Sequence, residues 1–307
     1  MHKMLKKTYE KYSNFKFDNK FFTLDGKKRA YVDFNNLTTL WFNTGTLCNI
    51  ECKNCYIKSS PKNDYLEYIS FKEVNKYLDQ LKKYPETKNI GFTGGEPFMN
   101  PEIIFMLNDS LSRGYDVLIL TNAMRPLMRH KASLLDLNKR FTNKLTIRVS
   151  LDHYKPVVHN KHRGANSFEK TIEGLNWLNK NNFNIKVASR IFNNETEKQV
   201  REGFKNLFKL YDIDINSNLS ENLVVFSEMF ENNDVSEISD ECWGKVQLSP
   251  KDLMCSNSRM VVKKKSSQEA NIQACTLIAY KNEFNLGKDL TTAEKRVYLN
   301  HHFCSQF

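Results

Sequence analysis

The segment NTGTLCNIECKNCYIKSS, residues 43–60, carries three cysteines at the spacing C-x-x-x-C-x-x-C, namely Cys48, Cys52 and Cys55. A loop this short can bring three thiolates to one face of a compact metal cluster. Iron–sulfur cubanes are usually held by four thiolates, so three protein ligands leave one iron open to an exogenous ligand. The alternative is a zinc site that a distant Cys or His completes. The segment therefore predicts a metal centre with three cysteine ligands from one loop.

The residues on both sides of this loop alternate between apolar, strand-like runs and helical patterns. Strand-like runs are found at 36–45, 88–97, 115–122, 144–152, 183–192 and 221–230. Helical patterns fill the intervals at 70–84, 100–114, 125–140, 167–182 and 195–211. Strand–helix–strand units of this kind make right-handed crossovers between parallel strands. They predict an α/β fold over residues 36–231, a partial (β/α)6 TIM-like barrel.

Small and polar residues stand where several of these strands end. Functional sites in parallel α/β folds lie at the carboxyl ends of the strands. We therefore expect the cysteine loop to share one site with the glycine turn GFTGGEP (91–97), Asn122, Ser150 and Asp152. Each of these features is located independently of the others, so their convergence at one edge of the sheet is the strongest argument for a single site.

The last part of the chain, residues 232–307, departs from the strand–helix alternation. Residues 258–280 have the pattern of a β-hairpin with a polar turn, and residues 291–302 that of a short helix. Cys255 precedes the hairpin, Cys275 is expected in its second strand, and Cys304 follows the helix. The sequence thus predicts three parts, an N-terminal extension (1–35), the barrel (36–231) and a small C-terminal hairpin-plus-helix extension (232–307).

Composition and charge narrow the class of protein. The seven cysteines among 307 residues leave nearly 190 residues between Cys55 and Cys242 without any, which in a reducing cytosol favours metal binding over disulfides. The formal charge of +11 comes from scattered lysines rather than a basic block, which disfavours a nucleic-acid partner. No apolar run approaches the roughly 18–20 residues of a membrane span, and no secretory signal is present. These features predict a cytoplasmic protein that is not inserted in a membrane.

The cysteine triplet, followed about forty residues later by GFTGGEPFMNPE, resembles the radical S-adenosylmethionine (SAM) superfamily. In this family the three thiolates bind a [4Fe–4S] cluster, and SAM chelates the open iron through its amino and carboxylate groups. One electron cleaves SAM to a 5′-deoxyadenosyl radical, which abstracts a hydrogen atom from the substrate. The resemblance implies an enzyme with this cluster and SAM as cofactors.

Residue by residue, the resemblance assigns Cys48, Cys52 and Cys55 to the cluster. It assigns SAM contacts to Gly94, Gly95, Glu96, Asn122, Ser150, Asp152, Arg190 and Tyr56. Within that set, the glycine turn and Glu96 correspond to the contact with the methionyl ammonium, and Arg190 to the contact with the carboxylate. The family often has an aromatic residue before the third cysteine, but Asn54 stands there. No glycine-rich adenine motif is evident in 212–226, so the adenine contacts are left open.

Cys255, Cys275 and Cys304 resemble the auxiliary-cluster extension called a twitch or SPASM domain, which implies a second iron–sulfur cluster with these three ligands. The segment 151–178 also resembles the D…H…RG…SF stretch of radical SAM proteins with such extensions. The fourth ligand is left open between Cys242, a substrate atom and a residue outside the chain. The alternative is that these cysteines are ordinary buried thiols.

The resemblance implies a peptide or small-metabolite substrate and an electron donor of the flavodoxin or ferredoxin type. The basic charge balance favours an acidic or phosphorylated substrate. Two other functions stay open: a radical SAM enzyme that modifies RNA, and a zinc-binding adaptor without catalysis. No catalytic residue can be named from the sequence.

Overall fold

The computed structural model describes residues 15–192, 194–229, 234–245 and 248–306. Its main feature is a nine-stranded sheet in the order β10-β9-β8-β2-β3-β4-β5-β6-β7. Six strands of the predicted barrel lie in sequence order and pair in parallel: β2 (Thr39–Asn43), β3 (Asn89–Thr93), β4 (Asp116–Thr121), β5 (Leu145–Ser150), β6 (Asn184–Arg190) and β7 (Leu223–Phe226). The predicted partial barrel is confirmed. Because β7 and β10 are the two edges of the sheet, the barrel does not close.

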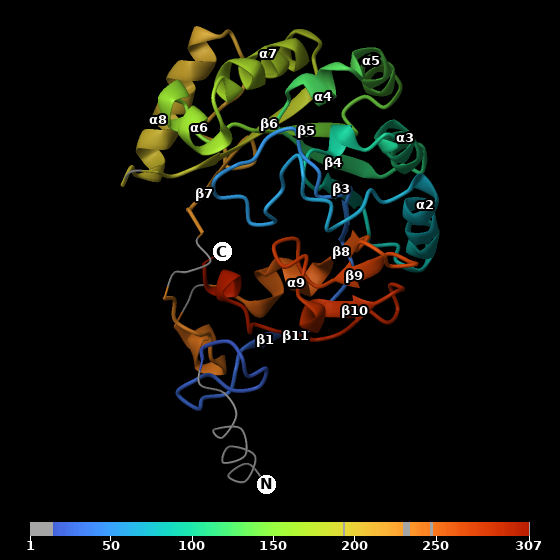
Figure 1. Ribbon diagram of the computed structural model, residues 1–307, viewed down its shortest axis with the longest axis vertical. Coiled ribbons are helices and arrows are strands. Elements are labelled where there is room, and N and C mark those ends of the chain that lie inside the picture. The colour runs from blue at the N-terminus through green and yellow to red at the C-terminus, as the bar shows by residue number, and fades with distance from the viewer. Residues whose placement is uncertain (1–14, 193, 230–233, 246–247, 307) are drawn as a thin grey trace.

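Helices cover the outer side of these strands, as Figure 1 shows for α2, α3, α5, α7 and α8. Their bounds are α2 (Phe71–Gln80), α3 (Ile103–Ser112), α4 (Arg125–Met128), α5 (Lys131–Arg140), α6 (Pro156–Arg163), α7 (Ser167–Lys180) and α8 (Glu197–Leu210). Local sequence explains where α2 begins, since Ser70 and Glu73 form a capping box that satisfies two free backbone N–H groups. Val74, Tyr77 and Leu78 then lie one turn apart and are buried against the sheet.

The pleat of the strands separates the core from the inner face. In β5, Leu145, Ile147 and Val149 are buried and pack in the hydrophobic core, whereas Thr146, Arg148 and Ser150 alternate with them and are half-buried. Successive side chains of a strand point to opposite faces of a sheet, so the half-buried set faces the concave side. The loop after β2 lies on this side in Figure 1.

The C-terminal part extends the same sheet. β8 (Ser258–Val262) pairs in parallel with β2, and β9 (Asn271–Gln273) and β10 (Asn285–Gly287) follow as antiparallel neighbours. The predicted hairpin is therefore confirmed, although Cys275 lies two residues beyond β9 rather than in it. The predicted domain boundaries stay predictions, and β8 joins the third part to the barrel sheet.

The predicted helix at 291–302 is wrong. This stretch contains β11 (Val297–Tyr298), which pairs antiparallel with β1 (Tyr31–Val32) of the N-terminal extension. Val297 and Leu299 are both buried, two residues apart, which is the period of a strand. The partner strand lies more than 260 residues away in the chain, so local sequence could not reveal the pairing. Only the short 3-10 helix η6 (His302–Ser305) follows.

None of the helices formed by the described residues is both long enough and apolar enough to cross a lipid bilayer.

Candidate functional site

The cysteine loop lies over the carboxyl ends of the parallel strands, between β2 and α2. Cys48, Cys52 and Cys55 are not joined in disulfides, and all three line one cavity of about 230 Å³. Backbone hydrogen bonds fix the loop, from Cys48 N to Ser60 O (3.1 Å) and from Lys53 N to His162 O at the end of α6 (2.8 Å). The structure thus brings the three predicted ligands together at the edge of the sheet where the sequence predicts the site.

Burial dominates the acid–base behaviour of these thiols. Burial, with a smaller contribution from the nearby Glu96, Cys52 and Cys55, raises the pKa of Cys48 to about 12. Burial also raises the pKa of Cys52, although the positive charge of Arg163 opposes the shift. Because the thiolate is the metal-binding form, metal binding here would release protons.

The donor set fits an iron–sulfur cluster, since three unpaired thiols face one shared cavity. Among the described residues, no three His, Cys, Asp or Glu side chains converge on a point where a single metal ion could be held. A cubane presents its irons at separate corners, so its thiolates need not meet at one point.

The glycine turn after β3 holds the cysteine loop in place. Gly95 N donates to Gly45 O (2.7 Å), and Glu96 N donates to Leu47 O (3.1 Å). A Cβ atom on Gly95 would lie 2.2 Å from Leu47 O, so a side chain there would displace the loop backbone. Gly94 also lines the cavity, with a φ of +152° that favours glycine. The turn therefore positions the loop, a role that the sequence analysis did not predict.

Glu96 joins this turn to the end of β4. Its carboxylate accepts hydrogen bonds from Thr121 Oγ1 (2.8 Å), Asn122 N (2.8 Å) and Phe98 N (3.2 Å). Burial raises the pKa of Glu96 to about 7, although the hydrogen bonds from Asn122 and Thr121 oppose the shift. Glu96 does not line the cavity, so its predicted contact with the SAM ammonium stays a prediction. What the structure assigns to it is a positioning role.

Asn122, at the end of β4, lies between the cysteine loop and the next turn. Its Nδ2 donates to Asn49 Oδ1 (2.9 Å), and its Oδ1 accepts from Met124 N (3.0 Å). The same Nδ2 is 4.0 Å from Cys48 Sγ. Asn122 and Tyr56 both line the cavity, and burial raises the pKa of Tyr56 to about 12.

The remaining predicted SAM contacts come from β5 and β6. Ser150, Asp152 and Arg190 all line the cavity. Arg190 Nη1 donates to Asn54 O (3.1 Å), between the second and third cysteines, and Arg190 Nε is 3.9 Å from Asp152 Oδ1. Arg190 therefore links β6 to the cysteine loop.

Arg163, which the sequence analysis included in the D…H…RG…SF stretch but gave no role, completes this network. Its Nη2 donates to Asp152 Oδ1 at 2.9 Å; the Asp152 side chain is buried, and that of Arg163 is only 11% exposed. Burial alone would raise the pKa of Asp152, but the charges of Arg163 and Arg190 outweigh it and hold this pKa below its usual value. Burial lowers the pKa of Arg163, and the charges of Asp152 and Cys52 more than reverse that effect.

A local signal could have found Arg163. Helix α6 has Pro156 at its first position and Gly164 directly after Arg163, the usual asymmetry of helix ends. Placing the helix there would have put Arg163 in its last turn, next to the strand ends.

Comparison with known proteins identifies the family of the chain. The Radical SAM superfamily profile matches residues 42–206, more than half of the chain. The chain belongs to the radical SAM superfamily. Members of this family are enzymes that use a [4Fe–4S] cluster and SAM.

Curated relatives match the radical SAM region. The chain is 29% identical over 167 residues to the antilisterial bacteriocin subtilosin biosynthesis protein AlbA of Bacillus subtilis, covering 54% of this chain and 33% of AlbA. It is 28% identical over 159 residues to GTP 3′,8-cyclase of Rhizobium etli, covering 50% of this chain and 43% of that enzyme. The matched regions thus span less than half of each relative.

The radical SAM fold is also found in solved structures. Streptococcus suis SuiB bound to precursor peptide SuiA aligns with a TM-score of 0.61 and 14% identity, covering 85% of this chain and 65% of SuiB. SuiB bound to S-adenosylmethionine aligns with a TM-score of 0.60 and 14% identity over 82% of this chain and 63% of SuiB. At this identity the likeness shows the fold.

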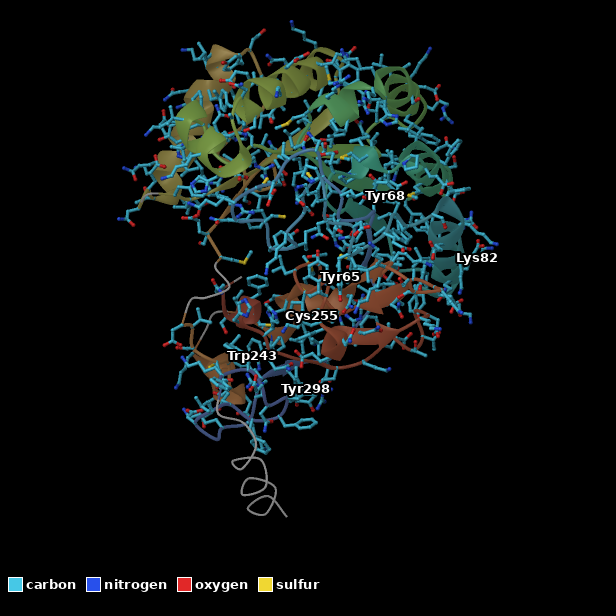
Figure 2. The ribbon with its side chains drawn as sticks, viewed as in Figure 1. Tyr65, Tyr68, Lys82, Trp243, Cys255 and Tyr298 are labelled. Carbon is cyan, nitrogen blue, oxygen red and sulfur yellow. The ribbon has the colours of Figure 1, made fainter. Side chains whose placement is uncertain are left out.

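A second cysteine triad lies outside the radical SAM cavity. Cys255, Cys275 and Cys304 line a mostly apolar cavity of about 60 Å³ in the C-terminal part of the molecule, where Figure 2 labels Cys255. Burial raises the pKa of Cys255 to about 12, and Cys275 raises it further. Cys242, considered as a fourth ligand, does not line this cavity, and its Sγ is 3.6 Å from Ser239 Oγ.

Proposed function

We propose that Cys48, Cys52 and Cys55 bind a [4Fe–4S] cluster with one iron open to SAM, and that the chain is a radical SAM enzyme. The observation that carries this proposal is the cavity itself. The three thiols share it with the glycine turn, Asn122 and Ser150, which come from three different strand ends. Each was predicted independently, and the family match covers all of them.

When bound, these cofactors supply a 5′-deoxyadenosyl radical through one-electron cleavage of SAM, with the electron coming from a flavodoxin or ferredoxin-type donor. The protein residues bind and orient. Gly94 and Gly95 hold the cysteine loop against β3, and Arg190 fixes the loop between its second and third cysteines. Asp152 pairs with the guanidinium of Arg163 at the end of α6. The backbone hydrogen bond from Lys53 N to His162 O joins the same helix to the cysteine loop.

The substrate that we propose is a peptide. This rests on AlbA, a bacteriocin biosynthesis protein, and on SuiB, solved with a precursor peptide. A nucleotide-like metabolite is the second candidate, because GTP 3′,8-cyclase is also a relative. The formal charge of +11 favours an acidic or phosphorylated group in either case.

We further propose that Cys255, Cys275 and Cys304 bind an auxiliary iron–sulfur cluster in a C-terminal extension that begins near residue 232. The support is that all three thiols, spread over fifty residues, reach one cavity. The ligand that completes this cluster would be a substrate atom or a group outside the chain, since Cys242 lies elsewhere. Unpaired thiols and iron–sulfur clusters suit a reducing cytoplasm.

The experiment is anaerobic reconstitution with iron and sulfide, followed by incubation with SAM and dithionite. The proposal predicts a brown protein that forms 5′-deoxyadenosine. A colourless protein with stoichiometric zinc and no 5′-deoxyadenosine would contradict it and support the adaptor alternative. Counting iron separates one cluster from two, at about four against about eight atoms per chain for cubane clusters.

A further inference from the structure

Arg148 projects into the cavity from the middle of β5. It stands two residues before Ser150 on the same face of the strand, so it lies about 6.6 Å further from the strand end that carries the candidate cofactor residues. Both residues line the cavity. Arg148 therefore faces the floor of the cavity rather than the cysteine loop.

Arg148 has no partner among the residues that the structure describes. Its Nε is buried without a hydrogen-bond acceptor. No described carboxylate forms an ion pair with its guanidinium. Burial lowers the pKa of Arg148, and no charge among the described residues opposes this shift. Arg148 is half-buried, and a cation that is partly removed from water in a folded protein is normally paired, because it otherwise loses part of its hydration without replacement.

Two other arginines show what a purely structural role requires in this fold. Arg29 is buried, pairs with Glu237 and donates to the carbonyl groups of Asn19 and Phe22. Arg259 is also buried and donates to four backbone carbonyls, including Ala293 O at 2.9 Å. Both guanidinium groups are satisfied by the protein itself. Arg148 differs because its acceptors are missing and its side chain faces a cavity.

One of the two neighbouring strands, β6, increases the positive charge at this level. Lys186 on β6 is in register with Arg148, so the two side chains leave the sheet on the same face. Leu120 is the neighbour in register on β4 and carries no charge. Neither Arg148 nor Lys186 has an acidic partner within the described part of the chain. Two adjacent cations without a counter-ion favour a bound anion.

We propose that Arg148 binds an oxyanion of the substrate on the cavity floor and so determines which substrates are accepted; Lys186 does not line the cavity and only adds positive charge from the adjacent strand. This inference rests on the proposed radical SAM function. A planar guanidinium matches a carboxylate or a phosphate in two parallel hydrogen bonds. The carboxylate of an acidic peptide side chain suits the proposed peptide substrate, and a phosphate would offer the same chemistry from a metabolite.

The test uses the anaerobically reconstituted chain with SAM bound, and measures binding of two capped tripeptides by calorimetry. The tripeptides, N-acetyl-Gly-Glu-Gly-amide and N-acetyl-Gly-Gln-Gly-amide, differ only in charge at the central residue. We expect the glutamate form to bind at least about 10-fold tighter, as for a hydrogen-bonded charge pair. Arg148→Gln should abolish this preference, and Arg148→Lys should keep part of it.

Arg140→Gln is the matched control, because Arg140 is exposed on α5 and does not line the cavity. It removes the same charge and should keep the preference.

Inorganic phosphate is the second probe. If phosphate competes with the glutamate tripeptide for the wild type but not for Arg148→Gln, the competition supports one shared oxyanion site at Arg148.

Wild-type iron content and SAM binding are measured on the same samples. If both are present and the preference is absent, or is unchanged in Arg148→Gln with native iron content, the inference on Arg148 is overturned. If iron and SAM binding are themselves absent, it is the proposed function that fails.

Discussion

The two cysteine triads differ in how the chain assembles them. Cys48, Cys52 and Cys55 come from one loop of eight residues and face a cavity of about 230 Å³, whose walls combine apolar side chains with polar and charged ones from several strand ends. Cys255, Cys275 and Cys304 come from three separate segments and face a cavity of about 60 Å³ walled mainly by apolar side chains. The first cavity is therefore roughly four times as large as the second.

The two cavities nevertheless share a wall. Met254 and Leu277 line both of them, and each stands within two residues of a cysteine of the second triad. Thr276 Oγ1 lies 3.3 Å from Met254 Sδ and also lines the larger cavity. A group in the large cavity would therefore be separated from the second triad by a few side chains only. The following predictions test whether the triads have the different roles that this arrangement indicates.

The largest effect is expected from Cys52→Ala. This change removes the middle ligand of the first triad, so the open-iron cluster should not assemble. Formation of 5′-deoxyadenosine, followed by chromatography after anaerobic incubation with SAM and dithionite, should fall to background. Retention of wild-type product would show that the first triad does not hold the SAM-cleaving centre.

Cys275→Ala should have a smaller and different effect. Because Cys275 belongs only to the second cavity, the variant should lose about four of about eight irons and still cleave SAM. Product formation from a substrate, once one is known, should be lost. Iron content equal to that of the wild type would show that Cys275 does not bind an auxiliary cluster.

Asp152→Asn tests the charged network behind the first triad. The change leaves Arg163 without its carboxylate, and removing one member of a buried pair costs about 3 kcal/mol of the free energy of unfolding. Urea unfolding of the metal-free chain measures it. Asp136→Asn, which breaks the exposed pair with Arg140, is the control and should cost under about 1 kcal/mol.

The pH dependence of this difference has a defined sign. The pKa of Asp152 is lowered in the folded chain, so its stabilisation is complete above the ordinary carboxyl pKa and is lost as the pH falls through the lowered value. The gap in the free energy of unfolding between wild type and Asp152→Asn should therefore narrow on acidification. A gap that widens towards acid would contradict the assigned charge network.

The smallest effect is expected from Cys242→Ser. Cys242 contacts Ser239 and does not line the second cavity. Iron content after reconstitution should equal that of the wild type. A loss of iron would instead make Cys242 the fourth ligand of the second triad.

The sequence predicted the features that depend on local pattern. The six parallel strands follow from apolar runs, and the first triad and GGEP turn follow from motifs with fixed spacing. Long-range pairing was missed, because Val297 and Tyr298 form a strand only by meeting Tyr31 and Val32. The position of Cys275 beyond β9 likewise depends on where tertiary packing ends a short strand.

Within the site, sequence predicted which residues gather but not what each contacts. The predicted contact of Glu96 with a cofactor stays a prediction, whereas the hydrogen bonds that its carboxylate accepts from Thr121 and Asn122 were not foreseen. Gly95 proved to be required by the cysteine loop, through the close approach of Leu47 O. Such contacts depend on how two loops pack, and no single-strand periodicity encodes that packing.

The central claim is that the first triad leaves one iron open for SAM. The most direct measurement is low-temperature electron paramagnetic resonance of the anaerobically reduced Cys275→Ala variant, in which only the first cluster is expected, before and after SAM is added. The account predicts a reduced [4Fe–4S] signal whose g values change on addition of SAM. A cluster signal that SAM leaves unchanged, at SAM concentrations that saturate binding, would contradict it.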